Sequence, residues 1–181
     1  MCEQMGALCG RTREEIQALL IDSGKQWEFE RGQLSAEEFH QWFEEATGQS
    51  VSYPDLVRAG SDIFELNASI VPVMDTLKDR GHRLVLLSNT CISHFEFIWN
   101  EYEVLQRFDD FATSYKAGAI KPERPIFDLA LSKIQCAPEE AFYTDDIADY
   151  VNVARGMGIQ AEVFTDTPTL IQHLAARDIQ V

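Results

Sequence analysis

Basic residues are scarce in this chain. Its 181 residues include 15 Lys and Arg against 30 Asp and Glu, which gives a formal net charge of −15 at pH 7. Nucleic acids and anionic membranes are bound mainly through Lys and Arg, so this balance argues against both as partners. It also means that any site for a phosphorylated ligand needs cations placed locally.

Long apolar runs and closely spaced cysteine pairs are also lacking. No stretch approaches the ~18 consecutive apolar residues of a membrane-spanning helix. The N-terminus has no basic region followed by an apolar run, so no signal peptide is expected. A chain with 45% hydrophobic residues can bury a core without disulfides, so we predict reduced thiols and a cytoplasmic location. The four cysteines, none in a Cys-x-x-Cys pair, are Cys2, Cys9, Cys91 and Cys136.

The first third of the chain shows only helical patterns. The segment Ser35-Ala36-Glu37-Glu38 is a capping box that opens a helix with Phe39, Trp42 and Phe43 on its apolar face. Gly48 follows the predicted end of that helix. We therefore predict an N-terminal helical subdomain over residues 1–68.

From residue 69 onward, short apolar strands alternate with helices. Strands that are apolar on both faces and separated by helices predict an α/β fold with a doubly wound, Rossmann-like parallel sheet, here a core over residues 69–181. In such sheets ligands bind beyond the carboxyl ends of the strands. The predicted strands are 83–87, 111–114, 141–144 and 161–164, and the predicted helices are 70–77, 91–102, 125–134, 147–155 and 168–176.

Polar residues follow two of these strand ends and one loop. Ser88, Asn89 and Thr90 stand where a strand turns into a helix, and such turns offer free N–H groups and hydroxyl donors to an anion. The alternative is a simple helix cap by Ser88 or Thr90. Lys121, followed by Pro122, can reach a phosphate or neutralise a carboxylate, unless it is a solvated loop lysine.

The pair Asp145-Asp146 is the most specific indication of a metal site in the sequence. Adjacent carboxylates at the end of a buried strand repel each other and lose hydration, and a hard divalent cation such as Mg²⁺ offsets both costs. No Lys or Arg lies in the next eight residues to pair with them. The alternative is that one of them caps the helix that follows. Asp149 and Asn152 lie one and two turns further along, where they could orient the pair.

In this order the three motifs resemble those of the haloacid dehalogenase-like hydrolase superfamily, whose members are mostly magnesium-dependent phosphatases. The resemblance covers nearly the whole chain. The helical first part is similar to the small helical cap of the branch that holds sugar-phosphate phosphatases and the phosphatase domain of soluble epoxide hydrolases. The matching segments are Leu84 to Thr90, Lys121 to Phe127, Phe142 to Asn152 and, in the cap, Phe29 to Phe39.

The resemblance implies a role for each matching residue. Ser88 and Asn89 would hold the phosphoryl oxygens of a small phosphorylated metabolite. Lys121 would bind phosphate as well and act as the catalytic residue that steadies the developing charge. Asp146, with Asp145 beside it, would hold Mg²⁺. The prediction allows a homodimer, and neither the substrate nor the oligomeric state can be deduced from the sequence.

The resemblance also requires a first motif, an apolar strand that ends in a nucleophilic Asp. We find no such motif in the sequence. Residues 1–10, which precede the helical part, contain no Asp. Asp22-Ser23-Gly24 mimics the motif but lies inside the cap pattern. The missing strand would be central, and losing about five buried apolar side chains at ~1.5–3 kcal/mol each removes as much stability as a domain has. We therefore expect a chain that begins at an internal Met, with tens of residues absent upstream.

Three functions remain open at this point. The first is a magnesium phosphatase that is truncated and inactive as given. The second is a non-catalytic relative that binds a phosphate ligand or a protein partner. The third is a receiver-like signalling domain, which uses an acid pair, a hydroxyl and a lysine in a different chain order.

Overall fold

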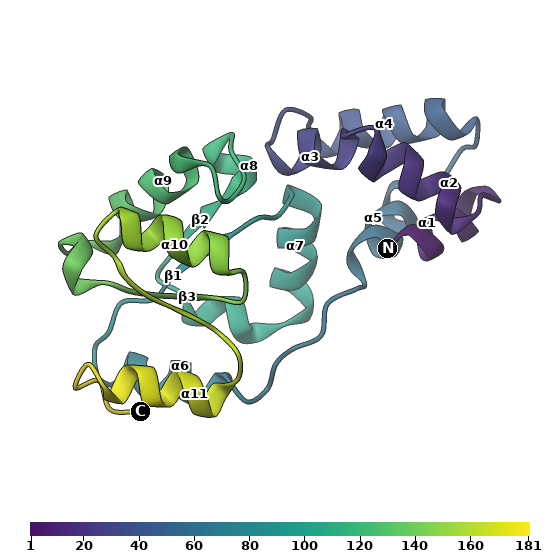
Figure 1. Ribbon diagram of the computed structural model, residues 1–181. Coiled ribbons are helices and arrows are strands. Elements are labelled where there is room, and N and C mark those ends of the chain that lie inside the picture. The colour runs from purple at the N-terminus through teal and green to yellow at the C-terminus, as the bar shows by residue number, and fades with distance from the viewer. The chain divides into compact units, whose positions relative to one another are not determined.

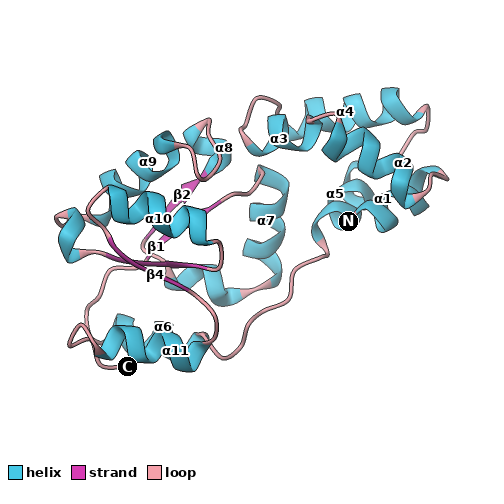
Figure 2. Cartoon of the chain, in the orientation of Figure 1, coloured by secondary structure: helices cyan, strands magenta, loops and turns pink.

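The computed structural model describes all 181 residues and divides them into two compact units. The first unit comprises residues 1–66, 89–105 and 113–120, and the second comprises 67–88, 106–112 and 121–181. Up to residue 66 the chain contains helices and no strand, as predicted (Figure 2). The finer division into a cap over 1–68 and a core over 69–181 stays a prediction.

The first unit is built from helices whose apolar faces meet in one core. Ile16, Leu20 and Phe43 are fully buried at its centre. The rings of Phe29 and Phe39 stack with their centroids 4.3 Å apart. The helices are α1 (Cys2–Cys9), α2 (Arg13–Gln17), the π-helical turn η1 (Ala18–Asp22), α3 (Lys25–Glu30), α4 (Ala36–Thr47), α5 (Tyr53–Ser61), α7 (Ile92–Glu101), the 3-10 turn η2 (Glu103–Arg107), which continues into the second unit, and α8 (Ser114–Ala117).

Local sequence signals fix the ends of these helices. The predicted capping box at α4 is present, with the Glu38 N–H donating to Ser35 Oγ at 3.1 Å and the Ser35 N–H donating to Glu38 Oε2 at 2.7 Å. Gly48 ends α4 in the left-handed conformation. Asp22 ends a π-helical turn and is followed by Ser23 and a left-handed Gly24, so Asp22 does not lie at a strand end.

Gly32 is a position where two requirements for glycine coincide. Its φ is +65°, and a Cβ at this position would lie 2.3 Å from the carbonyl oxygen of Tyr115. Gly48 has a similar φ of +69°, but a Cβ there would meet no other atom within 4 Å. Substitutions at the two glycines therefore distinguish the energetic cost of backbone strain from that of steric overlap.

We expect Gly32→Ala to lower the free energy of unfolding more than Gly48→Ala does. Both variants carry the strain of a left-handed alanine, about 1–2 kcal/mol, and Gly32→Ala adds roughly 1–3 kcal/mol because backbone must move to admit the methyl group. Urea denaturation of both variants measures the difference. Equal losses would mean that the approach of Gly32 to Tyr115 carries no energetic weight.

The second unit is layered, with strands between two pairs of helices. α6 and α11 lie side by side on one side of the strands, and α9 and α10 lie on the other (Figure 1). Val73, Leu170 and Leu174 form the buried apolar contact between α6 and α11. The elements are α6 (Val71–Asp79), β1 (Val85–Ser88), β2 (Asp110–Thr113), whose last residue belongs to the first unit, α9 (Arg124–Ile134), the 3-10 turn η3 (Pro138–Glu140), β3 (Phe142–Asp145), α10 (Ala148–Gly156), β4 (Gln160–Val163) and α11 (Thr167–Ala175).

The four strands form two separate sheets. β1 pairs with β2 and β3 pairs with β4, and the second pair is parallel, with Phe142 opposite Gln160 and Asp145 opposite Val163. No hydrogen-bonded ladder joins β1 to β3. The α/β class and all four predicted strands are confirmed, each within two residues of its predicted bounds. No helix combines the length and apolar character that crossing a membrane requires.

Candidate functional site

Lys121 forms a buried ion pair with Asp145 in the second unit. Lys121 Nζ lies 2.5 Å from Asp145 Oδ2, and the two side chains are 8% and 10% exposed. The same ammonium group donates to the Leu87 carbonyl at 3.2 Å and lies 4.9 Å from the centroid of the Tyr150 ring. Lys121 therefore joins the carboxyl ends of β1 and β3, which excludes the alternative of a solvated loop lysine.

The Asp145 carboxylate is held by three donors. Besides Lys121, the Tyr143 hydroxyl donates to Oδ2 at 2.6 Å and the Ile147 N–H donates to Oδ1 at 3.0 Å. Burial by itself would raise the pKa of Asp145, but the hydrogen bonds from Lys121, Tyr143 and Ile147 and the charge of Lys121 outweigh it and hold that pKa below its usual value. Asp145 is therefore ionised at neutral pH.

Tyr143 is a site residue that the sequence analysis missed. It stands two residues before Asp145 in β3, and alternate residues of a strand point to the same face. Burial, followed by the hydrogen bond to Asp145, raises the pKa of Tyr143, so the phenol stays protonated and acts as a donor. The spacing of two residues between this tyrosine and the aspartate at the strand end could have predicted the contact from the sequence.

Asp146 occupies a different environment from Asp145. It is exposed in the bend after β3 and takes no part in the ion pair. The expected orienting residues do not hold the pair: Asp149 is exposed, and Asn152 accepts a hydrogen bond from Arg155. As for the alternative of a helix cap, α10 has Ile147 as its N-cap residue and no side-chain cap, although Asp145 accepts a hydrogen bond from the Ile147 N–H.

Asp145 has a cation from a more distant part of the chain, beyond the eight following residues that contain no Lys or Arg. Lys121, 24 residues earlier, supplies that cation for Asp145. The residues present fit part of a Mg²⁺ site, since Asp146 offers an exposed hard oxygen donor and Mg²⁺ keeps several waters among its ligands. No three His, Cys, Asp or Glu side chains lie together in a group that could hold a metal ion.

The segment after β1 is held by contacts within the first unit. The Thr90 N–H donates to Ser114 Oγ at 2.9 Å, and the Ser114 hydroxyl donates back to the Thr90 carbonyl at 2.9 Å. α7 begins at Ile92 without a side-chain cap, so the expected alternative of a helix cap by Ser88 or Thr90 is wrong. Fully buried Ser114 was not singled out from the sequence, and no local pattern marks it.

The structure thus brings together the end of β1, Lys121 and the Asp145-Asp146 pair. Ser88 is the last residue of β1, next to the Leu87 carbonyl that accepts from Lys121. Asn89 belongs to the first unit. The charges of Lys121 and Asp145 cancel, which leaves Asp146 with a net negative charge at the strand ends. A phosphate dianion placed there would be repelled unless a cation accompanied it.

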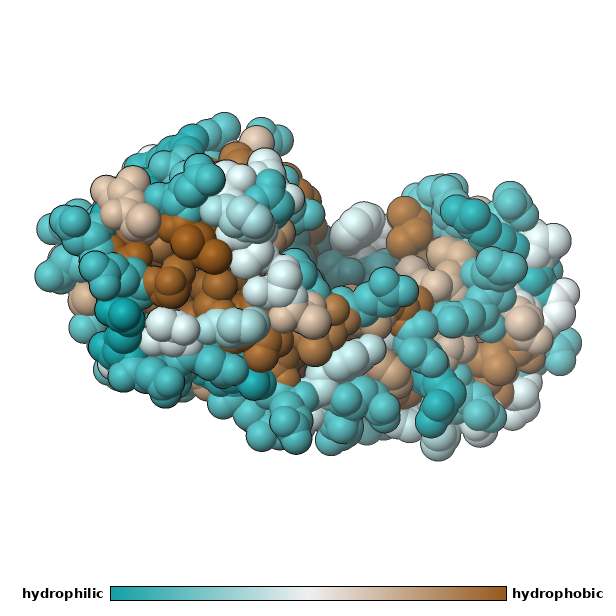
Figure 3. Space-filling view, turned by 90° about the horizontal axis from the view of Figure 1, so that it is seen from below, coloured by the Kyte–Doolittle hydropathy of each residue, from teal (hydrophilic) through white to brown (hydrophobic).

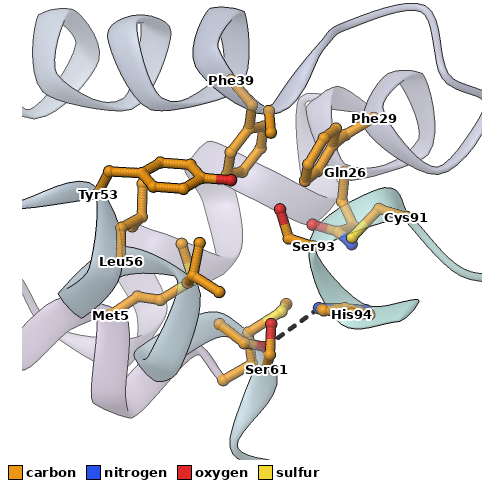
Figure 4. A pocket seen from close by; sticks show the side chains of 14 residues that line it. Met5, Gln26, Phe29, Phe39, Tyr53, Leu56, Ser61, Cys91, Ser93 and His94 are labelled. Carbon is orange, nitrogen blue, oxygen red and sulfur yellow. Dashed lines mark hydrogen bonds between the residues drawn. The ribbon is translucent and has the colours of Figure 1, made fainter. Parts of the chain in front are cut away.

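A separate small cavity lies inside the first unit (Figure 4). Its volume is about 30 Å³, which is enough for water. Ser61 is one of the residues that line this cavity, and its buried hydroxyl oxygen Oγ has no hydrogen-bond partner in the protein. The His94 Nε2–H donates to the Gly60 carbonyl at 3.1 Å, and burial lowers the pKa of His94 to about 4. Burial also raises the pKa of the Cys91 thiol to about 12, so this cysteine is no nucleophile.

Comparison with known proteins identifies the family to which this chain belongs. The family model described as "haloacid dehalogenase-like hydrolase" matches residues 6–158. The chain therefore belongs to the haloacid dehalogenase-like hydrolase family.

Among curated proteins, the chain is similar to D-ribitol-5-phosphate phosphatase of Bacteroides thetaiotaomicron, with 25% identity over 142 residues that cover 74% of this chain and 68% of that protein. It is also similar to bifunctional epoxide hydrolase 2 of Rattus norvegicus, with 25% identity over 113 residues that cover 60% of this chain. The chain spans only 20% of the length of that epoxide hydrolase.

Solved structures show the same fold. A haloacid dehalogenase family enzyme of Bacteroides thetaiotaomicron in complex with magnesium and inorganic phosphate is 22% identical, with a TM-score of 0.75 over 93% of this chain and 90% of that one. A predicted family hydrolase from Porphyromonas gingivalis is 23% identical, with a TM-score of 0.79 over 98% of this chain and 88% of that one.

Proposed function

We propose that this chain carries the phosphate- and metal-binding residues of a magnesium-dependent phosphatase that acts on a small phosphorylated metabolite such as a sugar phosphate. The observation that carries the proposal is the position of Lys121, whose ammonium group contacts the ends of both β1 and β3 beside the acid pair. A cytoplasmic location, a helical cap over residues 1–68 and a homodimer are further parts of the proposal.

In this proposal residues at the carboxyl ends of different strands bind the phosphoryl group and the Mg²⁺ ion. Ser88 and Asn89 hold the phosphoryl oxygens, and Lys121 steadies the charge that develops on them. Asp146, with Asp145 beside it, contributes carboxylate oxygens to Mg²⁺. The bound ion would offset the negative charge of the phosphate and polarise its oxygens. Support comes from the similar D-ribitol-5-phosphate phosphatase and from the magnesium- and phosphate-bound structure of a fold relative.

The 181-residue chain by itself is expected to have no phosphatase activity. The covalent phosphoryl transfer that the resemblance implies uses an attacking aspartate. The aspartates directly at the carboxyl end of β3, Asp145 and Asp146, are assigned in this proposal to the metal. The purified protein should not hydrolyse p-nitrophenyl phosphate with or without Mg²⁺. Magnesium-dependent turnover that disappears in Asp146→Asn would contradict this expectation.

The second candidate is a non-catalytic relative that binds a phosphate ligand or a protein partner, and the lack of a nucleophile among these residues favours it. The DNA immediately upstream of the codon for Met1 distinguishes the two. An in-frame apolar stretch ending in Asp-x-Asp or Asp-x-Gly supports the phosphatase, and adding that stretch should raise both thermal stability and turnover. An in-frame stop supports the non-catalytic relative.

Binding of inorganic phosphate tests what both candidates share. Phosphorus NMR titration in the presence of Mg²⁺ should show binding that weakens in Asp146→Asn and in Ser88→Ala. The matched control is Asp149→Asn, an exposed aspartate three residues after Asp146. Loss of binding in the control to the same degree, or no effect of Asp146→Asn, would remove these residues from the site.

A further inference from the structure

The cavity inside the first unit differs from a larger apolar groove in the second unit. That groove has a volume of about 450 Å³ and borders β1 and β3. Apolar side chains gather on the face of the second unit that is turned toward the viewer (Figure 3). The groove has the position of the central strand that the resemblance requires. The cavity is far smaller, at about 30 Å³, and every residue that lines it belongs to the first unit.

The lining of the cavity combines apolar walls with a few polar side chains. The apolar walls include Met5, Phe29, Phe39 and Leu56 (Figure 4). The polar side chains are those of Gln26, Tyr53, Ser61, Cys91, Ser93 and His94.

The cavity favours an uncharged occupant. No Asp, Glu, Lys or Arg side chain lines it. Burial keeps the pKa of the Cys91 thiol high and that of the His94 imidazole low, so both groups are neutral at pH 7. An ion in this place would lose its hydration without gaining an opposite charge from the side chains around it.

Ser61 supplies a hydroxyl group that lacks a partner. The residue is 1% exposed, and its Oγ forms no hydrogen bond within the protein. Its oxygen points toward the space between Met5 and Ser93 (Figure 4). The Tyr53 hydroxyl, by contrast, has Ser93 as a hydrogen-bond partner. Because an unpaired buried hydroxyl is costly, an occupant that hydrogen bonds to Ser61 would be stabilised there.

We infer that this cavity is a binding site for one short neutral alcohol, whose hydroxyl pairs with Ser61 and whose carbon atoms contact the apolar walls. The volume of about 30 Å³ is two to three times the ~10–15 Å³ that one water molecule needs, which suits a ligand of about three heavy atoms. Ser88, Asn89, Lys121, Asp145 and Asp146 do not line the cavity, so this binding would not depend on a phosphatase activity.

A short alcohol fits this lining better than water or a sugar. Buried water typically makes about three hydrogen bonds, whereas the lining of this cavity is mostly apolar. A sugar carries several hydroxyls and would leave most of them unpaired. One hydroxyl on a two-carbon body matches the single unpaired hydroxyl of Ser61 and the apolar walls beside it.

The test is a titration of the full 181-residue protein with ethanol, followed by the NMR chemical shifts of the backbone amides. We expect saturable shifts of amides in residues 56–61 and 91–94. The dissociation constant should be on the order of 1–10 mM, because three heavy atoms support no tighter binding than about 1 mM. The control ligand is 2-methyl-2-propanol, which has the same hydroxyl on a body too large for the cavity and should give no saturable shift.

Variants of the protein locate the binding. Ser61→Ala removes the hydrogen bond and should weaken ethanol binding about fivefold. Gly60→Ala should also weaken it about fivefold, because the added methyl group takes up room in the lining. That methyl group would lie 3.8 Å from Met5 Sδ, an ordinary contact, so this variant is expected to fold. Ser132→Ala removes an exposed hydroxyl that donates to the Leu129 carbonyl and should leave binding unchanged.

Three outcomes would overturn the inference. One is a set of shifts that grow linearly with ethanol or are equal with 2-methyl-2-propanol, which would indicate a solvent effect. Another is unchanged affinity in Gly60→Ala and Ser61→Ala, or in Gly60→Ala alone if Ser61→Ala does not fold. The third is a crystal structure at saturating ethanol with only water at Ser61 Oγ, because water would then be the occupant.

Discussion

Replacing Lys121 with methionine is expected to lower the free energy of unfolding by about 3–5 kcal/mol. Removing one partner of a buried ion pair leaves the other charge without compensation in a poorly solvated place, and such changes cost this much. Asp145 would keep its hydrogen bonds from Tyr143 and Ile147 but lose its cation. Urea denaturation at pH 7 measures the loss.

Two further variants show whether the loss comes from the buried charge. The double variant Lys121→Met with Asp145→Asn removes both charges and should be more stable than Lys121→Met alone. Lys133→Met removes a partly exposed ion pair with Asp110 and should cost about 1 kcal/mol or less. A Lys121→Met variant no less stable than Lys133→Met would show that the ion pair does not hold the strand ends together.

Acidification from pH 7 to pH 4 is expected to lower stability by about 3 kcal/mol through His94 alone. The folded pKa of His94 is about 4, below the unfolded value of ~6.5, so the unfolded chain binds more protons throughout this window. The stability that the neutral, buried imidazole contributes is present above pH ~6.5 and declines as the pH falls toward 4. Each unit of pKa difference corresponds to about 1.4 kcal/mol.

Comparison with His94→Gln isolates this contribution from the other titrating groups. A glutamine amide can still donate to the Gly60 carbonyl but does not titrate, so the variant should lose about 3 kcal/mol less than the unmodified protein over the same range. Burial raises the pKa of Glu30, so the contribution of Glu30 to stability changes with pH in the direction opposite to that of His94. This contribution is the same in both proteins and cancels when their pH dependences are compared. His82→Gln, an exposed histidine, should keep the full pH dependence. An unchanged pH dependence in His94→Gln would mean that His94 is not buried in solution.

The elements of this fold could be predicted because they depend on neighbours in the sequence. The capping box at Ser35 and Glu38 and the left-handed Gly48 bound α4 through contacts within a few residues. The four strands follow from short apolar runs between helical patterns. Periodicity and capping are local properties, so they can be deduced without knowing where the rest of the chain lies.

The candidate site could be predicted only in part. The sequence places Ser88 and Asp145 at strand ends and Lys121 in a loop, and these positions hold in the structure. It does not reveal that Tyr143 donates to Asp145 or that Ser114 binds the Thr90 backbone. Nothing in the local pattern around Ser114 distinguishes it from a surface serine, because its partner is 24 residues away.

The α/β class, the acidic charge and the positions of the motifs could all be deduced from the amino-acid sequence. The packed chain was needed to show that the cation beside Asp145 is Lys121 and that β1 and β3 border an apolar groove instead of pairing. Distance along the chain explains the difference. Ion pairs and strand pairings between remote segments depend on how the layers pack, and no local pattern of residues specifies them.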